Sequence, residues 1–230
     1  MPDIFSVVFS SPIPYSLTPL LPYMIIVMNL DTELCRVGGL ALTREALDYC
    51  GFAPGSRLAD IGCGSGATVR YLRAVGFDAE GFDCDAVIVE QAGPHCRLGD
   101  ASRLPFEAES LDGLFFECSL SQMEDRQSVL AEARRILKGG GALVMSDLYF
   151  RDGVEGGLLP SAGGWQKIIT DAGFTVLLFK DKSDGLAEFA ARLLWQYGRT
   201  GIKELCGCDM EELKAGRCGY FLLIARKGGG

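Results

Sequence analysis

A glycine loop between a buried strand and a helix is the feature of this sequence most suited to ligand chemistry. Gly62, Gly64 and Gly66 lie in the segment LADIGCGSG, residues 58–66. Glycine lets the backbone turn sharply and approach a ligand without a side-chain clash, so a nucleotide-like group fits there. Asp83 ends the next predicted strand, where a carboxylate can accept hydrogen bonds from both ribose hydroxyls. The loop and Asp83 together predict a nucleoside site.

The glycine spacing alone does not identify the ligand, because Gly62-x-Gly64-x-x-Ala67 also satisfies the dinucleotide fingerprint. Asp60, two residues before the first glycine, separates the two possibilities. A carboxylate there repels a diphosphate and attracts the ammonium group of a methionine moiety. Asp60 therefore favours S-adenosylmethionine (SAM) over NAD, and the sequence has no obvious tyrosine-lysine or histidine centre for hydride chemistry.

The elements that must position these residues alternate between strand and helix patterns, which predicts an α/β fold with a doubly wound, mostly parallel sheet. Three consecutive glycines at 139–141 are expected to stop a helix before the fifth strand. Segment 181–219 is too long for a hairpin turn, and its apolar residues repeat at helical spacing, so we expect a C-terminal cap over the acceptor side. The expected strands are 57–61, 79–82, 96–98, 113–117, 142–147, 174–180 and 220–225, and the expected helices are 40–50, 67–75, 86–92, 126–137, 165–172 and 186–197.

Three further motifs carry a family resemblance: GDA at 99–101 followed by LPF at 104–106, SLDGLFFE at 110–117, and RILKGGG at 135–141. Together with the glycine loop they resemble the class I SAM-dependent methyltransferases, in particular the small-molecule branch related to ubiquinone-biosynthesis enzymes. The likeness spans about residues 57–149. A bacterial subgroup of that branch is resembled in three places: residues 36–43, the strand end at 117–118 and the cysteine-bearing C-terminal region. This likeness does not indicate a substrate.

The resemblance implies a Rossmann-like sheet of seven strands whose last strand, 220–225, is antiparallel. It also implies SAM as cofactor, with Asp83 on the ribose, Asp100 and Ala101 on the adenine, and Asp60 orienting the methionyl end. Arg36 would pair with the SAM carboxylate. The full set of predicted cofactor-binding residues is Arg36, Asp60, Gly62, Cys63, Gly64, Gly66, Asp83, Cys84, Asp100, Ala101 and Glu117.

Methyl transfer from a sulfonium is an in-line displacement in which alignment supplies much of the acceleration. Candidate acceptor-side residues therefore lie at the carboxyl ends of the fourth and fifth strands. We predict Glu117, Cys118 and Tyr149 as catalytic residues, with Ser119 beside them. His95, the only histidine, is expected to be solvated in a surface loop.

Composition restricts the partners. With 30 acidic and 22 basic residues the formal charge is −8, which disfavours nucleic acids and anionic membranes and favours a small-molecule substrate. The nine scattered cysteines are typical of reduced thiols in the cytoplasm.

Residues 1–30 form an apolar, proline-containing leader that we do not expect to span a membrane, and residues 31–230 form the methyltransferase domain. The sequence sets no oligomeric state.

Cys206, Cys208 and Cys218 offer three thiols close together, which could bind zinc or a soft metalloid. Because neither C-x-x-C spacing nor a neighbouring histidine accompanies them, no metal site is predicted. The main prediction is methyl transfer from SAM to a small molecule. The alternatives are a thiol or arsenite-type metalloid methyltransferase, a SAM-binding protein without catalysis and, less favoured, an NAD-type oxidoreductase.

Overall fold

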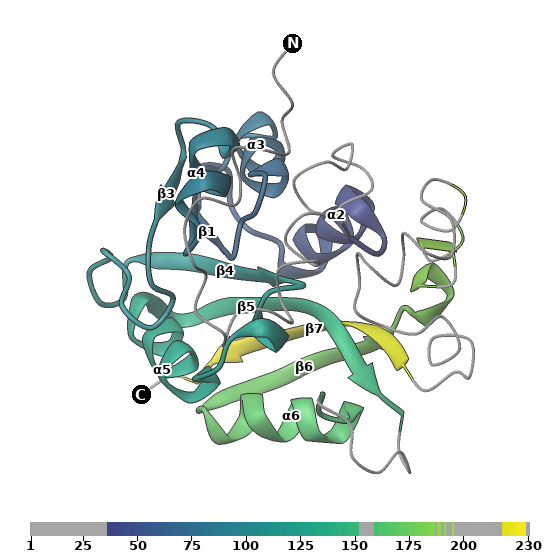
Figure 1. Ribbon diagram of the computed structural model, residues 1–230. Helices are drawn as coiled ribbons and strands as arrows, with labels where there is room; N and C mark the ends of the chain where they lie inside the picture. Colours follow the sequence, from purple (N-terminus) through teal and green to yellow (C-terminus); the bar gives the residue numbers. More distant parts are fainter. Residues whose placement is uncertain are drawn as a thin grey trace, which may run out of the picture.

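One seven-stranded sheet organises the protein. The computed structural model describes residues 36–151, 159–186, 188, 189, 191, 195 and 218–228. The strands follow the order β3-β2-β1-β4-β5-β7-β6 across the sheet (Figure 1). Their bounds are β1 Arg57–Ile61, β2 Asp78–Asp83, β3 Cys96–Leu98, β4 Leu111–Glu117, β5 Leu137–Phe150, β6 Phe174–Asp181 and β7 Cys218–Lys227.

Helices cover both faces of this sheet, with α2 and α3 on one side and α5 and α6 on the other (Figure 1). The helices are α2 Gly39–Cys50, α3 Ala67–Ala74, α4 Ala86–Ala92, α5 Arg126–Ile136 and α6 Ala162–Asp171, with a short 3-10 turn, η2, at Leu120–Gln122. In the part of the chain that the structure describes, no helix is long and apolar enough to cross a membrane.

The strand directions confirm the predicted topology. β7 runs antiparallel to both of its neighbours, β5 and β6, whereas β1 to β5 pair in parallel. The chain passes outward from β1 to β3 and then returns to place β4 beside β1. Open α/β sheets bind ligands at the carboxyl ends of strands where the order reverses in this way. The end of β1 and the end of β4 are therefore where a site is expected.

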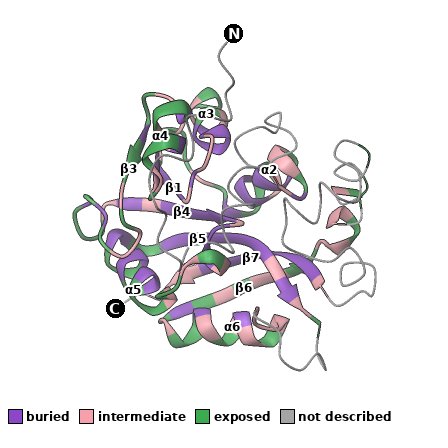
Figure 2. Ribbon diagram, viewed as in Figure 1, coloured by how far each residue is buried: buried purple, intermediate pink, exposed green. Residues whose placement is uncertain are grey.

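Alternating side chains on the central strands fill two separate cores. Leu114 and Phe116 of β4 face α5 and α6, whereas Phe115 packs with α2 and α3. Because helices cover both faces, β4, β5 and β7 are buried along most of their length (Figure 2). The face that a residue occupies therefore decides which helices it can meet.

The three glycines at 139–141 lie within a strand, so the prediction that they separate helix from strand was wrong. α5 ends at Ile136, and β5 begins at Leu137, which pairs with Leu111 of β4. The register then shifts between Leu111 and Gly113, and Gly140 adopts a φ of +74°. Glycine makes this irregularity possible because other residues rarely adopt positive φ.

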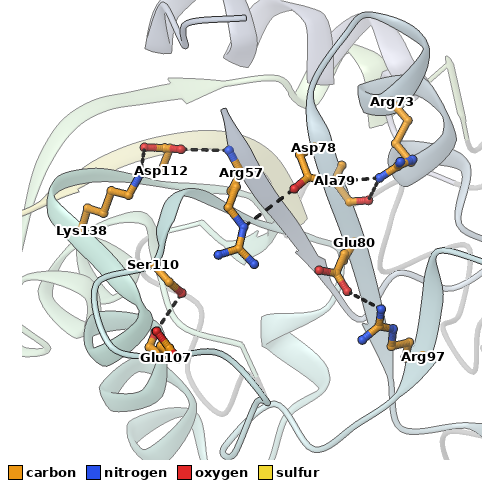
Figure 3. A network of polar contacts seen from close by, with 10 residues as sticks. All are labelled: Arg57, Arg73, Asp78, Ala79, Glu80, Arg97, Glu107, Ser110, Asp112 and Lys138. Atoms are coloured by element: carbon orange, nitrogen blue, oxygen red, sulfur yellow. Dashed lines mark hydrogen bonds and ion pairs between the residues drawn. The ribbon is translucent and has the colours of Figure 1, made fainter. Parts of the chain in front are cut away.

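Charged side chains join neighbouring strands near the edge opposite the expected site (Figure 3). Asp78 at the start of β2 lies 3.8 Å from the Arg57 Nε and 3.3 Å from an Arg73 Nη. Lys138 pairs with Asp112 at 2.7 Å. These side chains are largely exposed, so each pair contributes only about 0 to 1 kcal/mol to stability.

Several predictions fall outside the described residues: the leader at 1–30, Cys206, Cys208 and most of the cap at 181–219. Within the cap, residues 183–186, 188, 189, 191 and 195 have helical backbone. Leu186 and Phe189 from this stretch pack against the core on the α2 side of the sheet.

Candidate active site

The glycine loop turns directly from β1 into α3, and all three of its glycines have positive φ: 75° at Gly62, 51° at Gly64 and 73° at Gly66. The amide of Gly62 donates to the carbonyl oxygen of Phe82 at 2.7 Å, which ties the loop to β2. A Cβ atom on Gly62 would lie 2.5 Å from the Cβ of Ser119, so no other residue fits between β1 and the segment after β4. The Ser119 hydroxyl donates to the Ile61 carbonyl at 2.6 Å. The loop is therefore fixed before any ligand binds.

Asp83 lies where the sequence predicts it, at the end of β2 beside the loop. Its Oδ2 accepts a hydrogen bond from the Gly64 amide at 2.9 Å, and its Oδ1 accepts one from the Asp85 amide at 3.1 Å. A carboxylate oxygen has two lone pairs, so each can accept one further bond. The backbone thus orients a half-buried carboxylate that still has capacity for two hydroxyl groups.

The predicted adenine-side residues lie next to Asp83, because the Gly99 amide donates to the Asp83 carbonyl at 2.9 Å. Asp100 follows and is exposed, and its Oδ1 accepts bonds from the amide and the hydroxyl of Ser102 at 2.8 and 2.7 Å. Ala101 is half-buried against the core, and Cys84 is exposed. These residues therefore share the carboxyl edge of β2 and β3 with the loop.

Arg36 and Glu117 form a buried ion pair on the α2 side of the sheet, with 2.9 Å between Nη2 and Oε2. Two threonines complete the network. The Thr43 hydroxyl donates to Oε1 of Glu117 at 2.9 Å, and the Thr68 hydroxyl donates to Oε2 at 2.5 Å. Arg36 in turn donates to both threonine hydroxyls. Thr43 and Thr68 were missed by the sequence reasoning.

Asp60 lies near this pair and is only 3% exposed. Its Oδ1 and the Nε of Arg36 are buried polar atoms without a hydrogen-bond partner. Burial, followed by the neighbouring charge of Glu117, raises the pKa of Asp60 well above its usual value, although Arg36 opposes the rise. Buried polar groups without partners are costly and rare in folded proteins, and both atoms are available to pair with polar groups of a bound molecule.

The methionyl end of SAM fits these atoms. Asp60 and Glu117 bring two acidic groups against the single guanidinium of Arg36, so a cation is favoured near them. The free Oδ1 of Asp60 can accept from an ammonium group, and the free Nε of Arg36 can donate to a carboxylate. A dinucleotide diphosphate has no cation to offer at this position.

Cys118 directly follows β4 and has a φ of 56°, a left-handed conformation that non-glycine residues rarely adopt. Its Sγ lies 2.9 Å from the Tyr220 hydroxyl, which donates to the Ser146 hydroxyl at 3.1 Å. Burial raises the pKa of Cys118 to about 12 and that of Tyr220 well above its usual value. Both groups are therefore neutral at physiological pH. The sequence indicated only that Tyr220 lies in an apolar strand, and it did not indicate this contact.

Tyr149 lies on the other face of the sheet. Its ring packs against Phe179 and Phe221 in the α5 and α6 core. The structure therefore brings Glu117 and Cys118 together with Arg36 and Asp60, and it places Tyr149 apart from them.

His95 and the C-terminal cysteines take no part in this constellation. His95 is exposed just before β3, at the amino edge of the sheet, as the sequence predicts. Cys218 begins β7. Within the described ranges, no cluster of three or more histidine, cysteine or acidic residues could hold a metal ion.

Comparisons with known proteins agree with this geometry. A family model described as a methyltransferase domain matches residues 59–145, which include the glycine loop, Asp83, Asp100 and Glu117. An O-methyltransferase from Pyrenophora dematioidea is 26% identical, with 85% of this chain and 84% of the relative covered. The O-methyltransferase cnsE from Penicillium expansum is 28% identical, with 85% and 80% covered.

Solved structures share the fold. The [4+2]-cyclase SpnF superposes with a TM-score of 0.70 and 23% identity, with 94% of each chain covered. A geranyl diphosphate methyltransferase in complex with SAM superposes with a TM-score of 0.70 and 20% identity, with 82% of this chain and 85% of that chain covered. The domain match and the relatives together show that the chain is a SAM-dependent methyltransferase.

Proposed function

We propose that this methyltransferase transfers the methyl group of SAM to the hydroxyl oxygen of a small, mostly apolar molecule, such as a phenol or an enol. The unpartnered Oδ1 of Asp60 beside Arg36 carries the cofactor part of this proposal, because it is a buried acceptor on β1 just before the glycine loop. The names of the O-methyltransferase relatives, which align with about four fifths of their own length, support oxygen as the acceptor atom.

The residues around the loop bind and orient the methyl donor. SAM supplies an electrophilic methyl group on a sulfonium when it is bound. Asp83 accepts hydrogen bonds from the ribose hydroxyls, and Asp60 and Arg36 hold the amino and carboxylate groups of the methionyl end. Because Asp83 and the loop are already tied by the Gly64 amide, little ordering is needed on binding.

Glu117 acts as a positioning residue in this proposal. Its two carboxylate oxygens accept from Thr43 of α2, Thr68 of α3 and Arg36. It therefore joins the segment before α2 and both helices to the end of β4. A carboxylate so fully engaged is poorly placed to take a proton from an acceptor, and it is well placed to fix Arg36.

The chemistry of the acceptor side favours an acidic hydroxyl. Cys118 and Tyr220 are neutral, and the Asp147 carboxylate of β5, whose oxygens accept the backbone amides of Ser121 and Leu148, is only 1% exposed. Among the described residues at this edge, no free base stands ready. A phenol or enol needs little help to lose its proton, so alignment with the sulfonium supplies most of the acceleration.

Two further proposals concern the surroundings of the site. The described part of the expected cap lies on the acceptor side, which is supported by the packing of Leu186 and Phe189 on the face that also holds α2. The protein acts in the cytoplasm on a small molecule, which is supported by its scattered, odd-numbered cysteines and its acidic composition.

A substrate panel tests the acceptor. Purified protein is incubated with SAM and with matched phenols, enols, amines, thiols and arsenite, and S-adenosylhomocysteine release and product masses are measured. We expect methylation on oxygen for phenols or enols. Methylation of amines, thiols or arsenite alone would overturn the oxygen assignment. Binding of NADH in place of SAM would overturn the cofactor assignment.

A further inference from the structure

Two buried cysteines lie together beneath the glycine loop, and the mechanism uses neither thiol. Cys63, within the loop, is 7% exposed, and Cys96, the first residue of β3, is 8% exposed. They are 33 positions apart in the sequence. β2 lies between them, since the Cys63 amide donates to the Phe82 carbonyl and Cys96 pairs in register with Gly81.

Two glycines leave the room that the thiols fill. A Cβ atom on Gly81 would lie 2.8 Å from both Cβ and Sγ of Cys63. A Cβ atom on Gly66 would lie 2.7 Å from the Sγ of Cys96. The Cys63 thiol therefore rests on the strand position next to Cys96, and the Cys96 thiol rests against the far end of the loop that carries Cys63.

The two thiols lie close to each other around Gly81, and their surroundings make them unequal. Interaction with Cys63 lowers the pKa of Cys96, and the positive charge of Arg70 adds to this effect against the cost of burial. Interaction with Cys96, followed by burial, raises the pKa of Cys63. Cys96 is thus the thiol of the pair that ionises more readily.

We propose that Cys63 and Cys96 form a redox modification site, at which a peroxide converts the two thiols into a reversible disulfide. The Cys96 thiol loses its proton and its sulfur attacks hydrogen peroxide, so that a sulfur–oxygen bond forms and the oxygen–oxygen bond breaks. The departing hydroxide takes up that proton and leaves as one water. The Cys63 sulfur then attacks the oxidised Cys96 sulfur, forming the disulfide and breaking the sulfur–oxygen bond. The proton of Cys63 leaves with that oxygen as a second water. The two sulfurs together lose two electrons, which the peroxide gains.

This site couples oxidation to cofactor binding. A disulfide holds its sulfur atoms about 2.05 Å apart and its Cα atoms within about 7 Å of each other. Because β2 lies between Cys63 and Cys96, the loop must move toward β3 when the bond forms. Cys63 lies between Gly62 and Gly64, whose amides are fixed by Phe82 and Asp83. Oxidation therefore disturbs the contacts that orient Asp83 and the loop, and it weakens SAM binding. The inference goes beyond the proposed acceptor chemistry and does not depend on it.

The test uses the full chain with stoichiometric hydrogen peroxide, followed by quenching, alkylation of remaining thiols and peptide mass mapping. SAM affinity is measured by calorimetry before oxidation, after oxidation and after reduction with dithiothreitol. The Cys96→Ser variant removes one sulfur with little change in volume. Cys50→Ser in α2 is the matched control, because Cys50 is as buried as Cys63 and burial raises its pKa to about 11.

We expect a peptide cross-linked through Cys63 and Cys96 in wild type and Cys50→Ser, with at least about a tenfold loss of SAM affinity that dithiothreitol restores. Cys96→Ser should keep its affinity under the same oxidation. Absence of the cross-link in wild type overturns the proposal, and so does an equal loss of affinity in Cys96→Ser. If Cys96→Ser does not fold, the wild-type map still decides, because cross-links to other cysteines without this one contradict the assignment.

Discussion

Asp83 offers a sharp test of how the site holds its cofactor, through the substitution Asp83→Asn. The change keeps the size of the side chain and removes its charge. An asparagine oxygen can still accept from the Gly64 amide, but its amide group then faces the Asp85 amide, which now donates to Oδ1. The variant therefore loses charge-assisted acceptance of the ribose hydroxyls and part of the orientation of the side chain.

The expected magnitude follows from the bonds affected. A hydrogen bond to a charged group contributes about 1.5 to 3 kcal/mol. Because Asp83 is half-buried and already oriented, we expect a loss near 2 kcal/mol for SAM binding, which corresponds to about a 30-fold rise in Kd. Asp83→Ala should weaken binding further, since it also frees the Gly64 amide.

The assay is calorimetric titration with SAM, and the control is a substitution of another aspartate in β2. Asp78 begins the same strand, at the opposite edge of the sheet, where it pairs with Arg57 and Arg73 (Figure 3). Asp78→Asn should leave the Kd for SAM within about twofold of wild type. A wild-type Kd for Asp83→Asn, or an equal loss in Asp78→Asn, would refute this reasoning.

Three other predictions concern buried charge. Burial and the charge of Glu117 keep the pKa of Asp60 high, and a bound cation favours its ionised form. SAM binding should therefore release protons and become stronger as the pH rises. Calorimetry in buffers of different ionisation enthalpy measures the proton release, and its absence would disprove this prediction. Glu117→Gln leaves the Arg36 charge buried without its ion-pair partner and should lower the free energy of unfolding by about 3 kcal/mol or more. Urea denaturation measures this loss against Asp112→Asn, at a side chain that is 28% exposed. Burial raises the pKa of Asp147 to about 6. Its contribution to stability, about 3 kcal/mol in all, is therefore complete below about pH 4 and is lost as the pH rises through 6. Asp147→Asn should remove that part of the pH dependence, and an unchanged profile of unfolding free energy against pH would contradict it.

Local patterns were enough to predict the sheet and the position of the glycine loop. The strands 57–61 and 96–98 and the helix 86–92 match the structure residue for residue, because each is bounded by turn residues. The loop and Asp83 were predictable because their spacing is fixed by a single β-α-β unit.

Side-chain partners from distant elements were not predictable in this way. Thr43 and Thr68 meet Glu117 across 74 and 49 positions, and no local pattern records such contacts. The position of Tyr149 depends on the register between β4 and β5, which pairs Glu117 with Ser146 and so directs Tyr149 to the opposite face. A shift of one residue exchanges the faces, and the glycines at 139–141 hide that register in the sequence.

The most direct test of the account is a crystal structure of the protein with bound SAM. The account predicts the ribose hydroxyls within hydrogen-bond distance of the Asp83 carboxylate. It also predicts the methionyl ammonium at Oδ1 of Asp60 and the methionyl carboxylate at Nε of Arg36, the two buried atoms that lack partners. A SAM molecule whose methionyl end lies away from Asp60 and Arg36, with those atoms still unpartnered, would contradict it.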